Sequence, residues 1–389
     1  MTFFFLLISL EILIYFSFKI FKKKFNWLIS IKDEIPNYDF KALKKFYYSS
    51  FDYKLGWVRK PNTSGYEKGK KDKIQYYIDK YGSRKSILNP KNARIVSVGD
   101  SYAFCRQVSD ENTWQNKLSV KIDSAILNYG VGNYGIDQAI LRIDNIYIPK
   151  QTEYMIMGFV PETILRIQSY WKHYLEFGNT FAFKPKFILK KNKLLLINQY
   201  IDKFEKYKSL KKNISFIRKN DRFYRDKFLK YSFSFPYVFS FFKNFKFNIS
   251  VYYILIKNFF SRNVNLKNDL YNIVMKHNLK NSQKYYNDKY SIQLLSRILE
   301  LFYNKCHKKK LRPILLVIPQ MHDLLSTELN HVAFFKKINK KNNNVIDMTE
   351  IFKNKKIQDL YIEDSYGGHL SEYGNSLVAD EINNYLKNN

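Results

Sequence analysis

Cysteine is scarce in this chain, which contains only Cys105 and Cys306, far apart in sequence and in unlike surroundings. Two cysteines placed in this way give neither a disulfide framework nor the ligand spacing of a metal site. The sequence also lacks internal repeats and linkers rich in Gly, Ser or Pro. Because 389 residues are enough to bury a proper core, the fold needs no disulfide bonds or structural metal ions for stability. We expect no cofactor and no metal ion.

Acidic residues are also few, since 34 Asp and Glu stand against 66 Lys and Arg, a formal net charge of +32. Such an excess is typical of proteins that bind nucleic acid, because they release counterions from a phosphate backbone. Here the excess is mostly Lys, spread along the chain among abundant Asn, Ile, Phe and Tyr, as an AT-rich genome would encode. No Arg-rich helix or zinc-ligand spacing accompanies it, so we predict no nucleic-acid partner. A surface this basic is favourable next to anionic lipid headgroups.

An almost unbroken apolar run covers residues 3–20, and Lys22, Lys23 and Lys24 follow it directly. About 20 apolar residues cross the hydrocarbon core of a bilayer, so we predict a single-pass membrane anchor here. Glu11 would cost about 3 kcal/mol at the centre of the bilayer if ionised. A cleaved signal peptide fits less well, since no basic region precedes the run and no small-x-small site follows it. The lysines alone would place the rest of the chain in the cytoplasm, and the side of the membrane stays open.

Short apolar runs rich in β-branched residues recur along the chain and alternate with helical patterns. The runs cover residues 95–98, 125–127, 154–157, 314–318 and 345–346. Each has the length and composition of a buried strand. The helical patterns cover residues 113–120, 138–146 and 372–386. Alternation of this kind predicts an α/β fold with a central parallel sheet covered by helices on both faces.

A long segment rich in Lys and aromatic residues interrupts this alternation and includes an apolar run over residues 231–260. Pro236 and the interspersed lysines argue against a second membrane span. The run fits either an amphipathic lid or membrane-surface helix, or a helical subdomain that packs its aromatic side chains against the sheet. We therefore expect an anchor over 1–24, a stem over 25–91, an α/β domain in two parts over 92–167 and 309–389, and an insertion or lid over 168–308.

Two loops carry side chains that can perform chemistry together. Gly99-Asp100-Ser101 follows the first predicted strand directly, at the carboxyl end where parallel sheets meet their ligands. His369 lies in a glycine-containing loop just before the last predicted helix. A serine hydroxyl is a poor nucleophile near neutral pH and needs an imidazole within hydrogen-bond reach to take its proton. We predict that Ser101 and His369 meet, with Asp364 or Glu363 orienting the imidazole.

The other histidines are given lesser roles. His322 follows the strand predicted over residues 314–318, and we interpret it as a substrate contact or a loop residue. The remaining four are expected on the surface or in the insertion, namely His173, His277, His307 and His331.

Four sequence blocks resemble, in the same order, those of SGNH/GDSL hydrolases. The blocks are VGDSY at 98–102, LNYGVGNYGIDQ at 127–138, GFVPETI at 158–164 and GHLSEYGN at 368–375. Upstream, LGW at 55–57 and KPN at 60–62 resemble the stem of membrane-anchored bacterial members. The similarity covers most of the chain outside the insertion. It implies a flavodoxin-like three-layer α/β/α sandwich with a central parallel sheet, the SGNH hydrolase fold.

The resemblance also implies roles for individual residues. Ser101 would be the nucleophile and His369 the general base. The oxyanion hole of the family is formed by the backbone N–H of the Ser, a Gly in the second block and an Asn in the third. In this chain Gly132 or Asn133 stands at the second position and Thr163 at the third. The departure matters, since losing one oxyanion donor can cost about 10²–10³ in rate.

The acid of the implied Ser-His-Asp triad departs as well. The family commonly places Asp two or three residues before the His, where this chain has Gly367 and Tyr366. Asp364 lies five residues before His369 and can serve if the intervening turn bulges. Glu363 is the second alternative, and a Ser-His dyad oriented by a backbone carbonyl is the third.

Together these features predict a membrane-anchored serine esterase or O-acyltransferase. Its expected substrate is an acyl ester, most simply an acetyl ester, of a carbohydrate or another cell-envelope component, so the protein would take part in polysaccharide modification. The expected partners are an acylated carbohydrate or lipid-linked substrate, and the membrane through the N-terminal helix. The alternative is a non-catalytic glycan-binding or scaffold protein on a degenerate SGNH fold, because Asn133 and Thr163 depart from the family pattern.

Overall fold

The computed structural model describes residues 2–24, 34–261, 266–342, 344–362 and 368–389. The chain forms two compact units that interleave along the sequence. The first contains Met1–Trp57, Gln168–Lys184 and Asn198–Val274, and the second contains Val58–Ile167, Pro185–Ile197 and Met275–Asn389. The predicted catalytic residues fall in the second unit.

A five-stranded parallel sheet forms the centre of the second unit. Its strands are β5 (Ile95–Gly99), β6 (Ile126–Gly130), β7 (Tyr154–Phe159), β10 (Arg312–Val317) and β11 (Val345–Asp347). Their spatial order is β11-β10-β7-β5-β6, and each neighbouring pair is parallel. Numbered along the chain, this is the 2-1-3-4-5 order of flavodoxin-like folds. The five runs read from the sequence are therefore confirmed as strands of one sheet.

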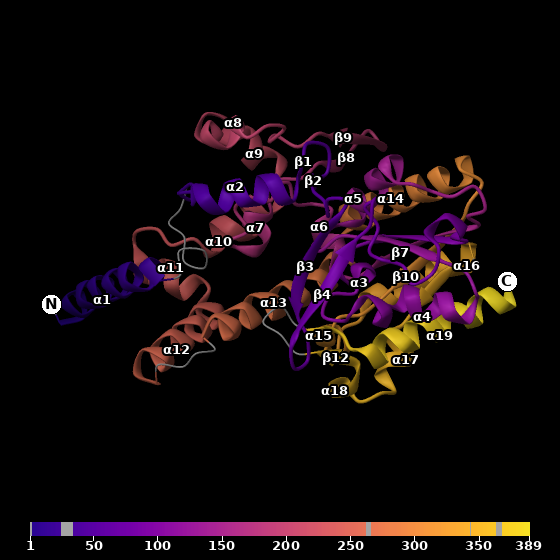
Figure 1. Ribbon diagram of the computed structural model, residues 1–389. Coiled ribbons are helices and arrows are strands. Elements are labelled where there is room, and N and C mark those ends of the chain that lie inside the picture. The colour runs from indigo at the N-terminus through magenta and orange to yellow at the C-terminus, as the bar shows by residue number, and fades with distance from the viewer. Residues whose placement is uncertain (1, 25–33, 262–265, 343, 363–367) are drawn as a thin grey trace. The chain divides into compact units, whose positions relative to one another are not determined.

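Helices cover both faces of this sheet, as the α/β/α prediction requires (Figure 1). One layer contains α4 (Trp114–Lys121) and α19 (Glu372–Asn388), which pack on each other. The other contains α5 (Ile136–Arg142) and α14 (Lys289–Lys308). Every residue of β5, β6 and β7 is buried, which explains why these strands are continuous apolar runs rather than alternating ones.

Smaller elements complete the second unit. A hairpin of β3 (Thr63–Lys68) and β4 (Lys73–Ile78) lies within the segment interpreted as a stem, and bridges from Ile78 to Arg84 and from Arg84 to Asn128 connect it to β6. A second hairpin contains β8 (Lys186–Lys190) and β9 (Lys193–Ile197). The remaining elements are η1 (Pro90–Asn92), α3 (Ser101–Phe104), η2 (Asp110–Asn112), η3 (Ile143–Asn145), α6 (Thr163–Arg166), α15 (Met321–Leu324), α16 (Asn330–Asn342), α17 (Thr349–Lys353), α18 (Ile357–Leu360), β12 (Tyr361–Ile362) and β13 (His369–Leu370).

The first unit is mostly helical. Its N-terminal helix α1 (Thr2–Lys24) contains a span from Phe4 to Lys22 that is long and apolar enough to cross a membrane, a property that signal sequences share. The other elements are α2 (Phe40–Ser49), β1 (Phe51–Asp52), β2 (Gly56–Trp57), α7 (Lys172–Glu176), α8 (Glu205–Lys208), η4 (Leu210–Asn213), α9 (Ile214–Asn220), η5 (Tyr224–Phe228), α10 (Leu229–Tyr231), α11 (Tyr237–Lys243), α12 (Phe245–Ser261) and the first part of α13 (Leu266–Tyr285).

The expectation that His331 lies on the surface is wrong. The side chain is completely buried, with Nε2 3.2 Å from the hydroxyl of Thr349 and Nδ1 3.1 Å from the amide nitrogen of Gln283. Burial lowers the pKa of His331 to about 4, so the ring is neutral at physiological pH. Polar residues precede it in sequence, and the packing of α16 carries the ring into the interior.

Candidate active site

Ser101 is the first residue of α3, directly after the carboxyl end of β5. β5 lies between β6 and β7, so this end is the point where the strand order of the sheet reverses and where α/β folds bind ligands. Gly99 is required here, because its φ is +148° and a Cβ would lie 1.8 Å from the carbonyl oxygen of Gly158. The chain can therefore turn sharply and present the hydroxyl at the sheet edge.

Asp100 fixes the turn that carries Ser101. Its buried carboxylate accepts hydrogen bonds from the backbone N–H groups of Tyr102, at 2.8 Å, and Val160, at 3.0 Å. Burial raises the pKa of Asp100 above its ordinary value, while the positive charge of Arg166 and the backbone donors oppose that rise. The carboxylate thus ties the loop after β5 to the loop after β7.

His369 reaches the same point from the other end of the chain. It begins β13, which pairs antiparallel with β12, and its Nε2 lies 2.9 Å from the Oγ of Ser101. The two side chains are 268 residues apart in sequence, and their residues are only 6% and 5% exposed. A hydroxyl and an imidazole at this distance have the geometry of a nucleophile and its base.

Neighbouring groups hold the backbone and ring of His369 in place. The hydroxyl of Tyr102 donates to the carbonyl of Gly368 at 2.8 Å, and the ring centroids of Tyr102 and His369 are 4.9 Å apart. The N–H of His369 donates to the side-chain oxygen of Gln107 at 3.0 Å, and the amide nitrogen of Gln107 donates to the carbonyl of Lys68. Gln107 has a φ of +71°, a conformation that a non-glycine residue adopts only when its surroundings impose it.

The pKa of His369 lies well below its ordinary value. The first cause is burial, and the positive charges of Arg106 and Arg166 act in the same direction. All three effects disfavour the imidazolium form. The ring is consequently neutral near pH 7, which is the state that can accept a proton from Ser101.

The loop after β6 contains Gly132 and Asn133, the predicted oxyanion residues of the second block. The N–H of Val131 donates to the carbonyl of Gly99, so this loop lies against the turn that precedes Ser101. A Cβ at Gly132 would meet no heavy atom of the described residues within 4 Å, whereas Asn133 has a φ of +67°. Gly132 therefore borders open space beside the turn.

Thr163, the predicted oxyanion residue of the third block, is completely buried. Its hydroxyl oxygen accepts a hydrogen bond from the N–H of Ile136 at 3.1 Å. This bond uses an acceptor lone pair of the hydroxyl, and the hydroxyl proton takes no part in it. The contact connects the loop after β7 to the first turn of α5.

Arg166, which the sequence analysis did not single out, joins the three loops of the site. Its guanidinium donates to Asp100 Oδ2 at 3.3 Å, to the carbonyl of Tyr134 at 3.2 Å and to Glu162 Oε2 at 2.7 Å. Asp100 follows β5, Tyr134 follows β6 and Glu162 follows β7. The planar fork of an arginine suits several acceptors at once, which a lysine could not serve in the same way.

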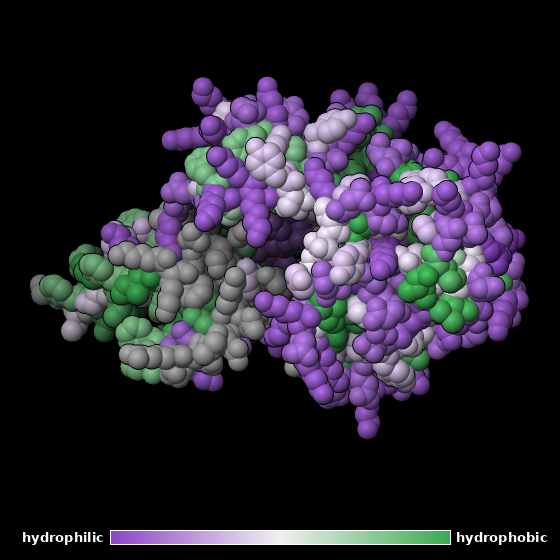
Figure 2. Space-filling view, viewed as in Figure 1, coloured by the Kyte–Doolittle hydropathy of each residue, from purple (hydrophilic) through white to green (hydrophobic). Residues whose placement is uncertain are grey.

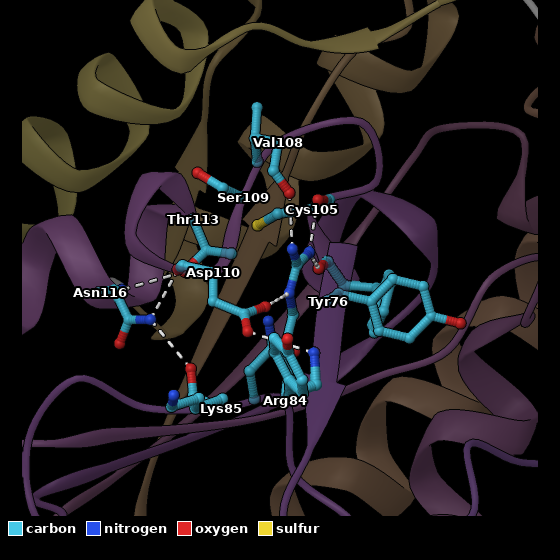
Figure 3. Close-up of polar contacts among 12 residues, drawn as sticks. Tyr76, Arg84, Lys85, Cys105, Val108, Ser109, Asp110, Thr113 and Asn116 are labelled. Atoms are coloured by element: carbon cyan, nitrogen blue, oxygen red, sulfur yellow. Dashed lines mark hydrogen bonds and ion pairs between the residues drawn. The ribbon is translucent and has the colours of Figure 1, made fainter. Parts of the chain in front are cut away.

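A second buried arginine shapes the loop that follows α3 (Figure 3). Arg84 pairs with Asp110, with Nε 2.7 Å from Oδ1, and is 2% exposed. Its remaining donors bind three backbone carbonyls at 2.6 to 2.7 Å, those of Phe104, Cys105 and Val108. These carbonyls flank Gln107, whose side-chain oxygen accepts the hydrogen bond from the backbone N–H of His369. Arg84 therefore positions Gln107, which in turn holds the backbone of the predicted base His369.

Two predicted residues lie outside the described part of the chain. Asp364 and the alternative Glu363 belong to residues 363–367, so the identity of the orienting group remains a prediction. Among the described residues, no group of three or more His, Cys, Asp or Glu side chains could hold a metal ion.

The sequence analysis missed three residues of the site, Arg84, Gln107 and Arg166. Each of them acts through the backbone or through residues distant in sequence. A compositional signal does mark the arginines. The chain has 12 Arg against 54 Lys, so Arg is the exception in its basic content, and Arg84, Arg142 and Arg166 are all buried.

No protein-family model and no curated protein matches this chain. The solved structures similar to it include a protein of Desulfitobacterium hafniense DCB-2 that is provisionally described as a lipolytic protein of the G-D-S-L family. The match covers 76% of this chain and 99% of that one, with a TM-score of 0.34 and 11% sequence identity. At this level of likeness the comparison assigns no role to any residue.

Proposed function

We propose that this protein is a serine-dependent ester hydrolase in which Ser101 is the nucleophile and His369 the general base. The observation that carries the proposal is the distance of 2.9 Å between Ser101 Oγ and His369 Nε2 at the reversal point of a flavodoxin-like sheet. Two further features support it, namely a neutral, buried imidazole and a tight glycine turn that places the serine at the sheet edge.

The reaction would proceed in two steps. Ser101 Oγ forms a bond to the ester carbonyl carbon while His369 takes the hydroxyl proton. The bond to the alcohol oxygen then breaks, and His369 returns the proton to the leaving alcohol. Water repeats the sequence on the acyl-enzyme and releases the acid. The developing oxyanion would be met by backbone N–H groups at Ser101 and at Gly132 or Asn133, with the Thr163 hydroxyl as a third donor.

The same site would serve an O-acyltransferase if a sugar hydroxyl replaced water in the second step. Both outcomes use the same acyl-enzyme, so the acceptor decides between them. A substrate close to the membrane, such as an acetylated cell-envelope glycan or a lipid-linked sugar, fits an enzyme that has an apolar N-terminal helix. The third member of the triad would be Asp364.

Mapping a covalent adduct tests the proposal directly. The full chain in detergent is treated with a fluorophosphonate probe, digested and analysed by mass spectrometry. We expect a single adduct on Ser101, because such probes react only with an activated serine. A folded protein that carries no adduct would favour the alternative, a non-catalytic glycan-binding scaffold.

The pH dependence of kcat/KM should reflect the lowered pKa of His369. The base works only when neutral, so a lower pKa in the folded enzyme keeps it active at more acidic pH. A base with an ordinary pKa of about 6.5 would lose about tenfold in rate between pH 7.5 and pH 5.5. We expect a clearly smaller loss over that range with a neutral ester.

Two arginine variants make this pH measurement specific. Removing the charge of Arg106 by Arg106→Gln should move the acidic limb to higher pH, because that charge helps to lower the pKa of His369. Arg94→Gln is the matched control, since Arg94 pairs with Glu153 on the surface. An acidic limb near pH 6.5 in the unmodified enzyme would contradict the burial argument.

A further inference from the structure

Helix α12 of the first unit has polar residues on its buried side and large apolar residues on its exposed side, the reverse of a helix on the surface of a water-soluble domain. Its buried side contains Asn248 and Asn258 together with Val251, Tyr252 and Leu255. Its outward side is apolar, with Tyr253 64% exposed and Phe260 80% exposed. Soluble domains place polar residues outward, and large exposed apolar patches mark interaction sites.

Helices α11 and α12 pack against one side of α1. The buried side of α1 includes Ile14 and Phe18. Aromatic pairs connect the helices, with ring centroids 5.4 Å apart for Tyr15 and Tyr237, and 5.3 Å apart for Phe21 and Tyr252. The three helices therefore form one cluster, which leaves the other sides of α1 exposed and apolar.

Glu11 explains how a charge is accommodated in the middle of α1. Its carboxylate accepts hydrogen bonds from the backbone N–H groups of Tyr237 and Val238, the second at 2.7 Å. These are the first residues of α11, whose N–H groups have no partner within the helix. The acidic residue that the sequence analysis treated as a cost to an isolated span is thus a contact between α1 and α11.

We infer that α11 and α12 are embedded in the same lipid bilayer as α1, as a helical hairpin that enters the hydrocarbon region without crossing it. The exposed apolar residues of the hairpin extend the apolar surface of α1 (Figure 2), and include Phe239, Phe242, Ile249, Tyr253, Ile256 and Phe260. Helix α12 has 17 residues, about 25 Å at the rise of an α-helix, which is shorter than the roughly 30 Å thickness of the hydrocarbon core.

Depth measurements on the full chain test this inference. Single cysteines are introduced at Leu13 in α1, at Ile256 and Phe260 in α12, and at Val120 in α4 as an exposed control. The native thiols can stay, because Cys105 and Cys306 are buried and burial raises both pKa values to about 12. Each variant is labelled with the fluorophore NBD and reconstituted into vesicles of phosphatidylcholine and phosphatidylglycerol.

Nitroxide groups on the lipid chains should quench the label at positions 256 and 260 at least half as strongly as at position 13. Aqueous iodide should quench only the label at position 120. Quenching at 256 and 260 by iodide would place the hairpin in water and overturn the inference. Protection from both quenchers would also overturn it, because a protein partner or a second copy would then cover the face. Failure of the lipid nitroxides to quench the label at position 13 would likewise overturn the inference, because α1 would then lie outside the bilayer.

Discussion

Alanine at Ser101 or at His369 should each lower the rate of ester hydrolysis by about 10³–10⁶-fold, and the double substitution should lower it no further. The two side chains are 2.9 Å apart and, in the proposed mechanism, act as one unit. Without the imidazole the hydroxyl keeps its proton, and without the hydroxyl the imidazole has nothing to activate. The measurement is kcat/KM for the two single variants and the double variant with one neutral acetyl ester.

The non-additivity separates catalysis from a general effect on structure. Two independent contributions would multiply, so the double variant would be far slower than either single variant. Ser376→Ala is a suitable control, since its exposed hydroxyl donates to the carbonyl of Glu372 one turn earlier in α19. Activity that survives in Ser101→Ala would mean that another nucleophile acts, and would end the proposal.

The sheet could be predicted from the sequence because its strands are defined locally. β5 and β7 are buried throughout and β10 is buried from Ile314 to Val317, so each appears as an apolar run of four or five residues that needs no distant information. The prediction of one parallel sheet followed from the alternation of strands and helices together with the family resemblance. The hairpin of β3 and β4 was missed, because its outward residues are polar and its turn resembles an irregular loop.

The site was predictable to the extent that its chemistry is carried by motifs. Ser101 and His369 lie in recognisable blocks, and the structure brings them together. Arg166 and Gln107 could not be found in this way, because their partners are backbone carbonyls, amides and carboxylates that only the folded chain assembles. The apolar run over residues 231–260 shows the same limit, since a polar buried side becomes visible only when the helix is placed against α1.

Replacing Arg84 with methionine should destabilise the second unit by about 3–5 kcal/mol, the cost of leaving a buried charge without its partner. Among the described residues, the buried carboxylate of Asp110 would then keep one hydrogen-bond donor, the backbone N–H of Tyr77 at 3.2 Å. The carbonyls of Phe104, Cys105 and Val108 would lose the guanidinium as well. Burial already raises the pKa of Asp110, and removal of Arg84 would raise it further.

Hydrogen exchange of the β5 amides in the full chain measures this stability, because every residue of β5 is buried and the strand is paired on both sides. The matched control is Arg94→Met, which breaks an arginine–carboxylate pair of similar length whose side chains are 46% and 47% exposed. An exposed pair contributes at most about 1 kcal/mol, so this control should change exchange little. Since Arg84 positions the loop that contains Gln107, the folded fraction of Arg84→Met should also hydrolyse esters more slowly. Equal effects of the two substitutions would show that burial of the Arg84 network adds nothing to stability.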